Sequence, residues 1–302
     1  MLASAEETFE HLERLGDGAV NAGLLAALDA RGGGAEQGLA RANLLRRKGD
    51  MAGARKALAG WLASEGSPEG IALDDWSAIP YGLFSSGGFA IAPVVLVDDF
   101  LPRERMQALH AHACERKAQF RDALATNEDA APSYDPDRRR TLLDYAFTQE
   151  REFFLGFIEE SLAAMRDSLG LPAFEVDRIE LKLTNHVDGG FFKAHSDNHA
   201  AYGEAGRAIT WLYYFGEAEP RYSGGDLYVL DSKPASQEIS PAWFSRIESV
   251  PNRLVAFPSW FYHAVAPTRL PENRFEQGRF AVSSHVRKRK DGTTVWWDSK
   301  NR

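Results

Sequence analysis

The stretch Phe191-Phe-Lys-Ala-His-Ser-Asp197 places a short apolar run directly before a His-x-Asp pair. It is one of several short runs that alternate with glycine-rich turns, at residues 179–185, 191–194, 208–215, 226–230, 253–257, 263–265 and 279–287. Short strands at this spacing are typical of a sandwich or barrel rather than of alternating strands and helices. Neither common type of glycine-rich phosphate loop is present, so nucleotide-binding folds are less well supported.

The first 66 residues carry helical patterns only. Arg46-Arg47-Lys48 predicts the end of one helix, because basic residues favour the last helical turn. Gly49-Asp50 predicts a turn in which Asp50 caps the next helix, where Ala54, Leu58, Trp61 and Leu62 follow at helical spacing. This helical hairpin resembles one unit of a tetratricopeptide repeat. Helices also pair in this way for packing alone, so both interpretations are open.

The segment Gly66-Ser-Pro-Glu-Gly70 is typical of a linker. We therefore predict a helical segment at residues 1–66 and a second domain at residues 67–302. Within the second domain we expect a buried strand at residues 90–97, helices at 103–118 and 147–168, and a loop at 119–140. Together with the short strands, this pattern predicts an α+β protein with supporting helices around a β core.

Composition narrows the range of partners. The formal net charge of the 302 residues is −8, so bulk charge gives no reason to bind nucleic acid or an anionic membrane. The basic runs at 138–140 and 287–290 are short and fit a solvated face or a local anion contact. The single cysteine, Cys114, excludes disulfides within the chain. The longest apolar stretch, 89–97, is too short to span a bilayer, and the N-terminus lacks the pattern of a secretory signal, so we expect a cytoplasmic protein.

The pair His195 and Asp197 is a candidate for metal binding. Residues i and i+2 of a strand point to the same face, so the imidazole and the carboxylate converge on one point. His263, on a later predicted strand, offers a third ligand. Two histidines and one carboxylate leave the opposite face of an octahedral metal open, an arrangement that suits non-haem Fe(II). A His-x-Asp pair by itself is more often a surface pair, and zinc also accepts this ligand set.

Five motifs resemble, in order, those of the Fe(II)- and 2-oxoglutarate-dependent oxygenases, specifically the prolyl 4-hydroxylase-like branch. Asn185-His-Val-Asp-Gly-Gly-Phe-Phe-Lys-Ala-His-Ser-Asp197 is similar to that branch's Asn-Tyr-x-x-Gly-Gly-x-Tyr-x-x-His-x-Asp. The others are Ala208-Ile-Thr-Trp-Leu-Tyr-Tyr214, Ser223-Gly-Gly-Asp-Leu227, Arg253-Leu-Val-Ala-Phe-Pro-Ser259 with His263-Ala-Val-Ala-Pro267, and Gly278-Arg-Phe-Ala-Val-Ser283. With residues 94–109, the resemblance covers roughly two-thirds of the chain.

The resemblance implies a double-stranded β-helix, or jelly roll, at about residues 179–287. It also implies Fe(II) held by His195, Asp197 and His263, 2-oxoglutarate and O₂ as co-substrates, and ascorbate as a reductant. The implied reaction hydroxylates an unactivated C–H bond of a peptide, protein or amino-acid substrate and releases succinate and CO₂. Related halogenases carry a small residue in place of the carboxylate ligand, so Asp197 favours hydroxylation.

The same resemblance implies residues that bind 2-oxoglutarate. Its distal carboxylate needs a cation on the strand after the second histidine, and a guanidinium can pair with it bidentately. Arg279 has the strand context, whereas Arg274 has the more usual spacing; we favour Arg279. Tyr214 matches a position whose hydroxyl holds the co-substrate, and Ser283 shares the strand face of Arg279. His186 replaces the usual tyrosine and would need the right tautomer to donate a hydrogen bond.

Two other functions stay open. One is a jelly roll without turnover that binds ligands or senses oxygen or 2-oxoglutarate, although the intact His/Asp/His set argues against it. The other is a zinc-dependent hydrolase, for which the sequence offers no His-Glu-x-x-His signature. The sequence does not identify the substrate, the carbon that is oxidised or the oligomeric state.

Overall fold

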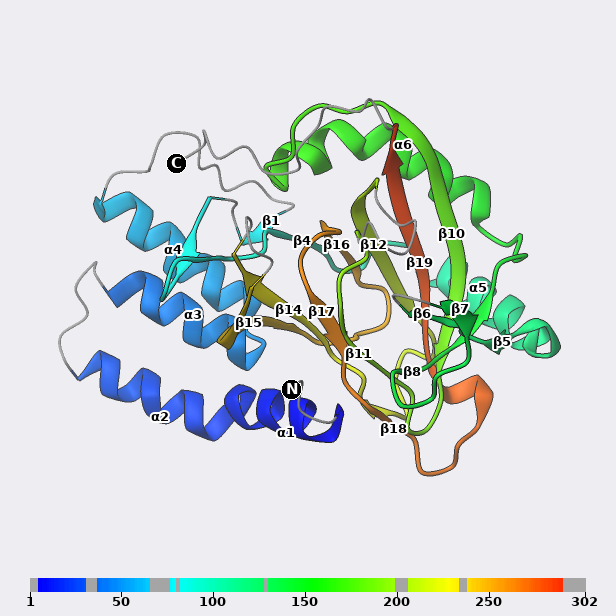
Figure 1. Cartoon of the computed structure of the whole chain (residues 1–302), viewed down its shortest axis with the longest axis horizontal. Coiled ribbons are helices and arrows are strands. Elements are labelled where there is room, and N and C mark those ends of the chain that lie inside the picture. Colours follow the sequence, from blue (N-terminus) through cyan, green and yellow to red (C-terminus); the bar gives the residue numbers. More distant parts are fainter. Residues whose placement is uncertain are drawn as a thin grey trace.

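The computed structural model describes residues 5–30, 37–65, 77–79, 82–127, 130–198, 206–233 and 238–289. Two antiparallel sheets face each other across a common interior (Figure 1). In order, the strands of the eight-stranded sheet are β1 (Ser77–Ile79), β4 (Val94–Val97), β16 (Leu254–Pro258), β12 (Arg207–Phe215), β19 (Arg279–Lys288), β10 (Val176–His186), β9 (Leu142–Asp144) and β5 (Arg121–Asp122). The predicted jelly-roll core and α+β class are confirmed.

Several of the predicted functional motifs lie on strands of the second sheet. Its order is β2 (Phe84–Ser85), β3 (Phe89–Ala90), β14 (Leu227–Ser232), β17 (His263–Val265), β11 (Phe191–His195) and β8 (Arg139–Arg140), with β15 (Ile239–Ile247) pairing to β14. Two small pairs, β6 (Ala125–Asn127) with β7 (Ala130–Ser133) and β13 (Ser223–Gly224) with β18 (Thr268–Arg269), lie apart from both sheets.

Residues 119–140 were predicted as a loop, and this prediction is wrong. The segment contains β5 and β8, which extend the two sheets by pairing with β9 and β11, and the small β6–β7 pair. Strands of two to four residues are too short to show an alternating pattern, and their pairing partners lie elsewhere in the chain. The predicted linker at residues 66–70 lies outside the described residues.

Side chains of the central strands β10, β19 and β12 point alternately outward, into an apolar layer, and inward, into the interior. Their outward-facing side chains, such as Leu183, Trp211 and Phe280, are fully buried. They pack beneath helices α5 (Arg103–Glu115) and α6 (Arg151–Ser168), which lie on the outer side of the sheet in Figure 1. The inward-facing residues of the same strands are mostly polar or small, so one face supplies the core and the other supplies a cavity.

The N-terminal helices lie on the opposite side of the molecule, beside β14 and β15 (Figure 1). They are α1 (Ala5–Gly16), α2 (Gly18–Asp29), α3 (Gly38–Lys48) and α4 (Met51–Glu65). The predicted helical turn is confirmed: Gly49 adopts φ 100°, and the Asp50 carboxylate accepts a hydrogen bond from the Gly53 amide at 2.8 Å. The helices are thus packed on the jelly roll through α1, α3 and α4. Across the described residues, no helix is long and apolar enough to cross a membrane.

A buried ion pair joins the helical segment to the jelly roll. The Arg46 guanidinium on α3 donates two hydrogen bonds, at 2.8 and 2.6 Å, to the Asp231 carboxylate on β14. Both side chains are buried, with exposed fractions of 1% and 0%. Burial raises the pKa of Asp231 despite the nearby positive charge. Each partner therefore depends on the other, because either charge left alone would be buried without compensation.

Replacing Asp231 tests this dependence. We expect Asp231→Ala to lower the free energy of unfolding by about 3–5 kcal/mol, because Arg46 then stays buried without its anion. Asp29→Ala, which removes the exposed partner of Arg41, should change it by less than about 1 kcal/mol. Urea denaturation of the full chain, followed by tryptophan fluorescence, measures both. Equal effects of the two substitutions would show that the buried pair contributes no more to the free energy of unfolding than the exposed pair.

Candidate metal centre

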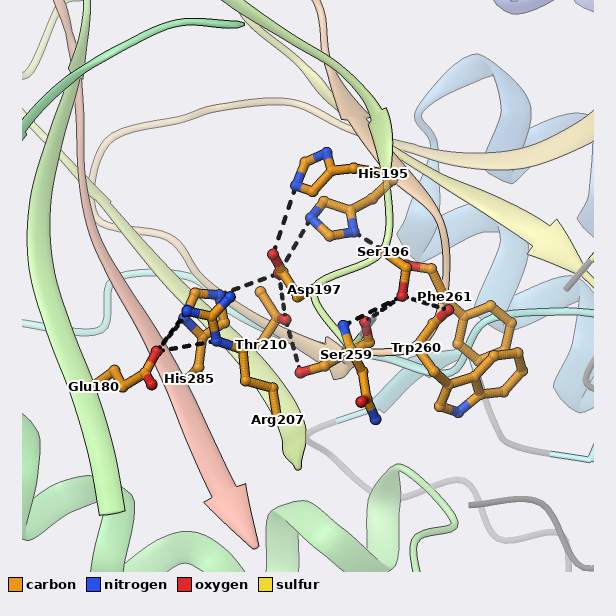
Figure 2. Close-up of polar contacts among 12 residues, drawn as sticks. Glu180, His195, Ser196, Asp197, Arg207, Thr210, Ser259, Trp260, Phe261 and His285 are labelled. Atoms are coloured by element: carbon orange, nitrogen blue, oxygen red, sulfur yellow. Dashed lines mark hydrogen bonds and ion pairs between the residues drawn. The ribbon is translucent and has the colours of Figure 1, made fainter. Parts of the chain in front are cut away.

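Two histidines meet across a pair of neighbouring strands. His195 ends β11 and pairs directly with His263, the first residue of β17. Their ring centroids are 4.2 Å apart. Asp197 follows β11, and its amide donates to the Ser259 carbonyl at 3.0 Å, which turns the chain so that the carboxylate faces both imidazoles. One ligand atom from each residue lies within 4.8 Å of the others (Figure 2).

Backbone carbonyls fix the orientation of both imidazole rings. His195 Nδ1 lies 2.8 Å from the Lys193 carbonyl oxygen, and His263 Nδ1 lies 3.1 Å from that of Phe261. A carbonyl can only accept, so each Nδ1 carries the proton and each Nε2 presents its lone pair. His195 Nε2 lies 3.6 Å from Oδ1 of Asp197, and His263 Nε2 lies 3.3 Å from Oδ2 of the same carboxylate. Hydrogen-bonded neighbours of this kind commonly orient the histidine ligands of metals.

The protonation states also suit a metal. Burial, together with the nearby His263, lowers the pKa of His195 to about 4, so the ring is neutral at neutral pH. Burial alone would raise the pKa of Asp197, but His285, His263 and hydrogen bonds hold it well below its usual range. The neutral imidazole of His195 and the carboxylate of Asp197 need lose no proton before they bind a cation.

A chain of polar contacts holds Asp197 from the other side (Figure 2). Thr210 on β12 donates to its Oδ2 at 2.7 Å, and His285 Nε2 on β19 lies 3.2 Å from the same oxygen. His285 Nδ1 is in turn 3.4 Å from Glu180, which also pairs with Arg207 at 2.8 Å. Sequence reasoning missed Thr210 as a contact of the ligand, although it shares a strand face with Tyr214.

Arg279 lies elsewhere on the inner face of β19. Its side chain is 2% exposed, and its Cζ lies 4.7 Å from the centroid of the Tyr214 ring. Its Nη1 is 3.3 Å from His186 Nδ1, but among the described residues neither its Nε nor its Nη2 has a hydrogen-bond partner. Gly225 of the Gly-Gly-x-Leu turn makes room, since a Cβ there would come within 2.6 Å of Arg279 Cδ. A buried guanidinium with open donors suits an anionic ligand.

His186 has both ring nitrogens in contact with neighbours. Arg279 can only donate, so Nδ1 of His186 accepts and Nε2 carries the proton toward Thr141 Oγ1 at 2.9 Å. Burial and the charge of Arg279 hold the pKa of His186 well below its usual range. The ring therefore stays neutral and orients Arg279.

The predicted residues share one cavity of about 760 Å³. His186, His195, Asp197, His263, Arg279 and Ser283 line it, while Tyr214 lies beneath Arg279. Arg274 does not line it and has a side chain that is 60% exposed. The donor set and the open donors of Arg279 fit a divalent metal at one place and a carboxylate-bearing ligand at another. These are the requirements of Fe(II) with 2-oxoglutarate.

Comparison with known proteins agrees with this fit. Residues 181–287 match the family model of the 2OG-Fe(II) oxygenase superfamily. A PKHD-type hydroxylase from Synechocystis, itself uncharacterised, is 28% identical over 196 residues, which are 64% of this chain and 62% of the relative. The match thus spans less than two-thirds of that relative's length.

Solved structures with a similar arrangement include two prolyl hydroxylases. One is a prolyl-4-hydroxylase from Pseudomonas putida, with a TM-score of 0.47 and 19% identity over 65% of this chain and 92% of that one. The other is a prolyl hydroxylase from Trichoplax adhaerens, in complex with a peptide fragment of hypoxia-inducible factor, with a TM-score of 0.47 and 16% identity over 65% and 83%. Residues 181–287, which match the family model and contain the His/Asp/His site, are thus similar to a domain of the 2OG-Fe(II) oxygenase superfamily, which uses Fe(II) and 2-oxoglutarate with O₂.

Proposed function

We propose that this protein is an Fe(II)- and 2-oxoglutarate-dependent dioxygenase that hydroxylates an unactivated C–H bond on a peptidyl or amino-acid side chain. The observation that carries the proposal is the convergence of His195, Asp197 and His263 within 4.8 Å in the cavity that also contains Arg279. When bound, Fe(II) with 2-oxoglutarate and O₂ supplies the oxidant that places one oxygen atom on the substrate, with succinate and CO₂ as co-products.

The residues of the chain have separate tasks in this proposal. His195, Asp197 and His263 bind the metal and leave its other face to the cavity. Arg279 binds the distal carboxylate of 2-oxoglutarate, with Tyr214 beneath its guanidinium and His186 beside it. Ser283 lines the cavity on the same strand. Thr210 and His285 hold Asp197 in place, so that the carboxylate keeps its orientation when ligands exchange.

A peptidyl or amino-acid substrate is supported by the form of the cavity. Leu124 and Tyr145 line its wall and are 54% and 66% exposed, so the cavity opens to the surface beside them. A side chain can enter there while the rest of a larger molecule stays outside.

We also propose that residues 1–66 are a helical segment that supports the oxygenase domain at 67–302, since α1, α3 and α4 cover the second sheet.

Metal binding and turnover test the proposal together. Purified protein with Fe(II), 2-oxoglutarate and candidate peptides should form succinate and a product heavier by one oxygen atom. Asp197→Ala should lose most Mn(II) binding, measured by calorimetry, and succinate formation should fall by at least about 100-fold, because a metal ligand is gone. Asp177→Ala, at an exposed position on β10, is the matched control and should behave as the wild type.

The outcome separates the two main interpretations. Tight binding of Mn(II) and 2-oxoglutarate without succinate under any condition would contradict an enzyme and favour a binding or sensing protein. Unchanged succinate formation by Asp197→Ala would contradict the metal site itself.

The two candidate arginines give a second test. Arg279→Gln should raise the KM for 2-oxoglutarate by about 10- to 100-fold, since charge-assisted hydrogen bonds to the distal carboxylate are lost. Arg274→Gln removes the same charge from an exposed side chain and should change KM by less than about twofold. Mn(II) affinity should be unchanged in both, which shows that the metal site is intact. A larger effect at Arg274 would reverse the assignment.

A further inference from the structure

The side chain of Lys182 lies in the cavity, and none of the residues that the structure describes pairs with it. Lys182 shares the inner face of β10 with Glu180, Thr184 and His186, which lie at every second position of the strand. It lies opposite Ser283 of β19. Its side chain lines the cavity. Within the described part of the chain, its ammonium group has neither a hydrogen bond nor an ion pair, whereas Arg207 and Arg287 both pair with Glu180. A partly buried ammonium without an anion is uncommon, because the desolvation of the charge is not offset.

The surroundings of Lys182 are themselves positive. Burial, followed by the charges of Arg207 and Arg139, lowers the pKa of Lys182 to about 8, although Asp197 and Glu180 act in the opposite direction, so the group is still mostly charged at neutral pH. Arg139 lies over the ring of Phe192, with its Cζ 4.4 Å from the centroid, and Phe192 stacks on His195. The nearby Asp197 already contacts Thr210 and three histidines. The positive charge therefore lies close to the metal centre, and no carboxylate of the described residues forms an ion pair with it.

The ligands of the proposed function do not neutralise this charge. A divalent metal, the Asp197 carboxylate, the two carboxylates of 2-oxoglutarate and the Arg279 guanidinium together carry no net charge. Lys182 is left over when all of them are bound. A buried charge is tolerated when a further ligand brings the opposite charge, and the remaining ligand is the substrate.

Lys182 also lies on the side by which a substrate would enter. Its strand β10 pairs with β9, and β9 pairs with β5 at the edge of the sheet. The exposed Tyr145 and Arg121 line the cavity at this edge, and the basic run that contributes Arg138 and Arg139 lines it from the second sheet. Arg279 lies on β19, further from the edge, so Lys182 is between the co-substrate side and the opening.

We propose that Lys182 binds a carboxylate of the substrate, so that the preferred substrates carry an acidic side chain or a free carboxy-terminus close to the carbon that is oxidised. This inference rests on the proposed function, because it assigns the metal and Arg279 to the co-substrate. Lys182 is then the residue that determines specificity, and Arg138 and Arg139 attract the same group at the opening.

Matched peptide pairs test the proposal by binding rather than by turnover. The full chain, loaded with Mn(II) and 2-oxoglutarate without O₂, is titrated calorimetrically with N-acetyl-Gly-Glu-Gly-amide and its Gln counterpart, and with N-acetyl-Gly-Pro as the free acid and as the amide. The wild type should bind at least one acidic member about 10- to 100-fold more tightly than its neutral counterpart, as expected for a hydrogen bond to a charged group. Lys182→Gln should reduce this ratio to less than about twofold, and Lys182→Arg should retain most of it.

The controls separate a binding role from a structural one. Lys182→Gln should keep the wild-type affinities for Mn(II) and 2-oxoglutarate and its melting temperature, and Lys56→Gln, at an exposed position on α4, should keep the peptide preference. The proposal is overturned if the wild type prefers neither acidic peptide, or if Lys182→Gln keeps the wild-type preference. It is equally overturned if Lys182→Gln loses 2-oxoglutarate affinity while its peptide preference is unchanged, since Lys182 would then serve the co-substrate. If the proposed function itself is wrong, a different result is expected: the wild type shows no metal-dependent binding of 2-oxoglutarate or forms no succinate.

Discussion

Antiparallel pairing of β10, β19 and β12 places every second side chain inside the jelly roll, and the site depends on this alternation. A register slip of one residue would move Arg279 and His285 from the cavity into the layer beneath α5 and α6. Phe280 and Val282 prevent the slip, since both are fully buried in that layer. Apolar packing on the outer face thus fixes the position of the polar groups on the inner face.

The parts of the site that the sequence predicted are those that local patterns encode. His195 and Asp197 converge as predicted, although Asp197 lies beyond the end of β11 and its backbone hydrogen bond to Ser259 turns it toward the imidazoles. The run that follows Phe257 indicates the turn before His263. The strand context of Arg279 also proved a better guide than the spacing of Arg274, because apolar neighbours at alternate positions show which residue faces an interior.

What the sequence did not reveal depends on pairing between distant segments. Thr141 contacts His186 across 45 positions, and Arg46 contacts Asp231 across 185. Nothing in the local sequence of either partner indicates the other. An arginine on a helix is predicted to be exposed unless the carboxylate that pairs with it is known. The two-residue strands β5 and β8 were not predicted for the same reason, because they are defined only by their pairing with β9 and β11.

The cavity also shows why bulk charge is a poor guide to a local site. The chain carries a formal net charge of −8, yet Arg121, Lys182 and Arg279 all line the cavity. At physiological salt, electrostatic effects decay over about 8 Å, so charges elsewhere on the chain have little effect on a ligand inside. A small carboxylate that reaches into the cavity meets the local positive charge of Arg121, Lys182 and Arg279, so a chain of net negative charge still offers a site for an acidic ligand.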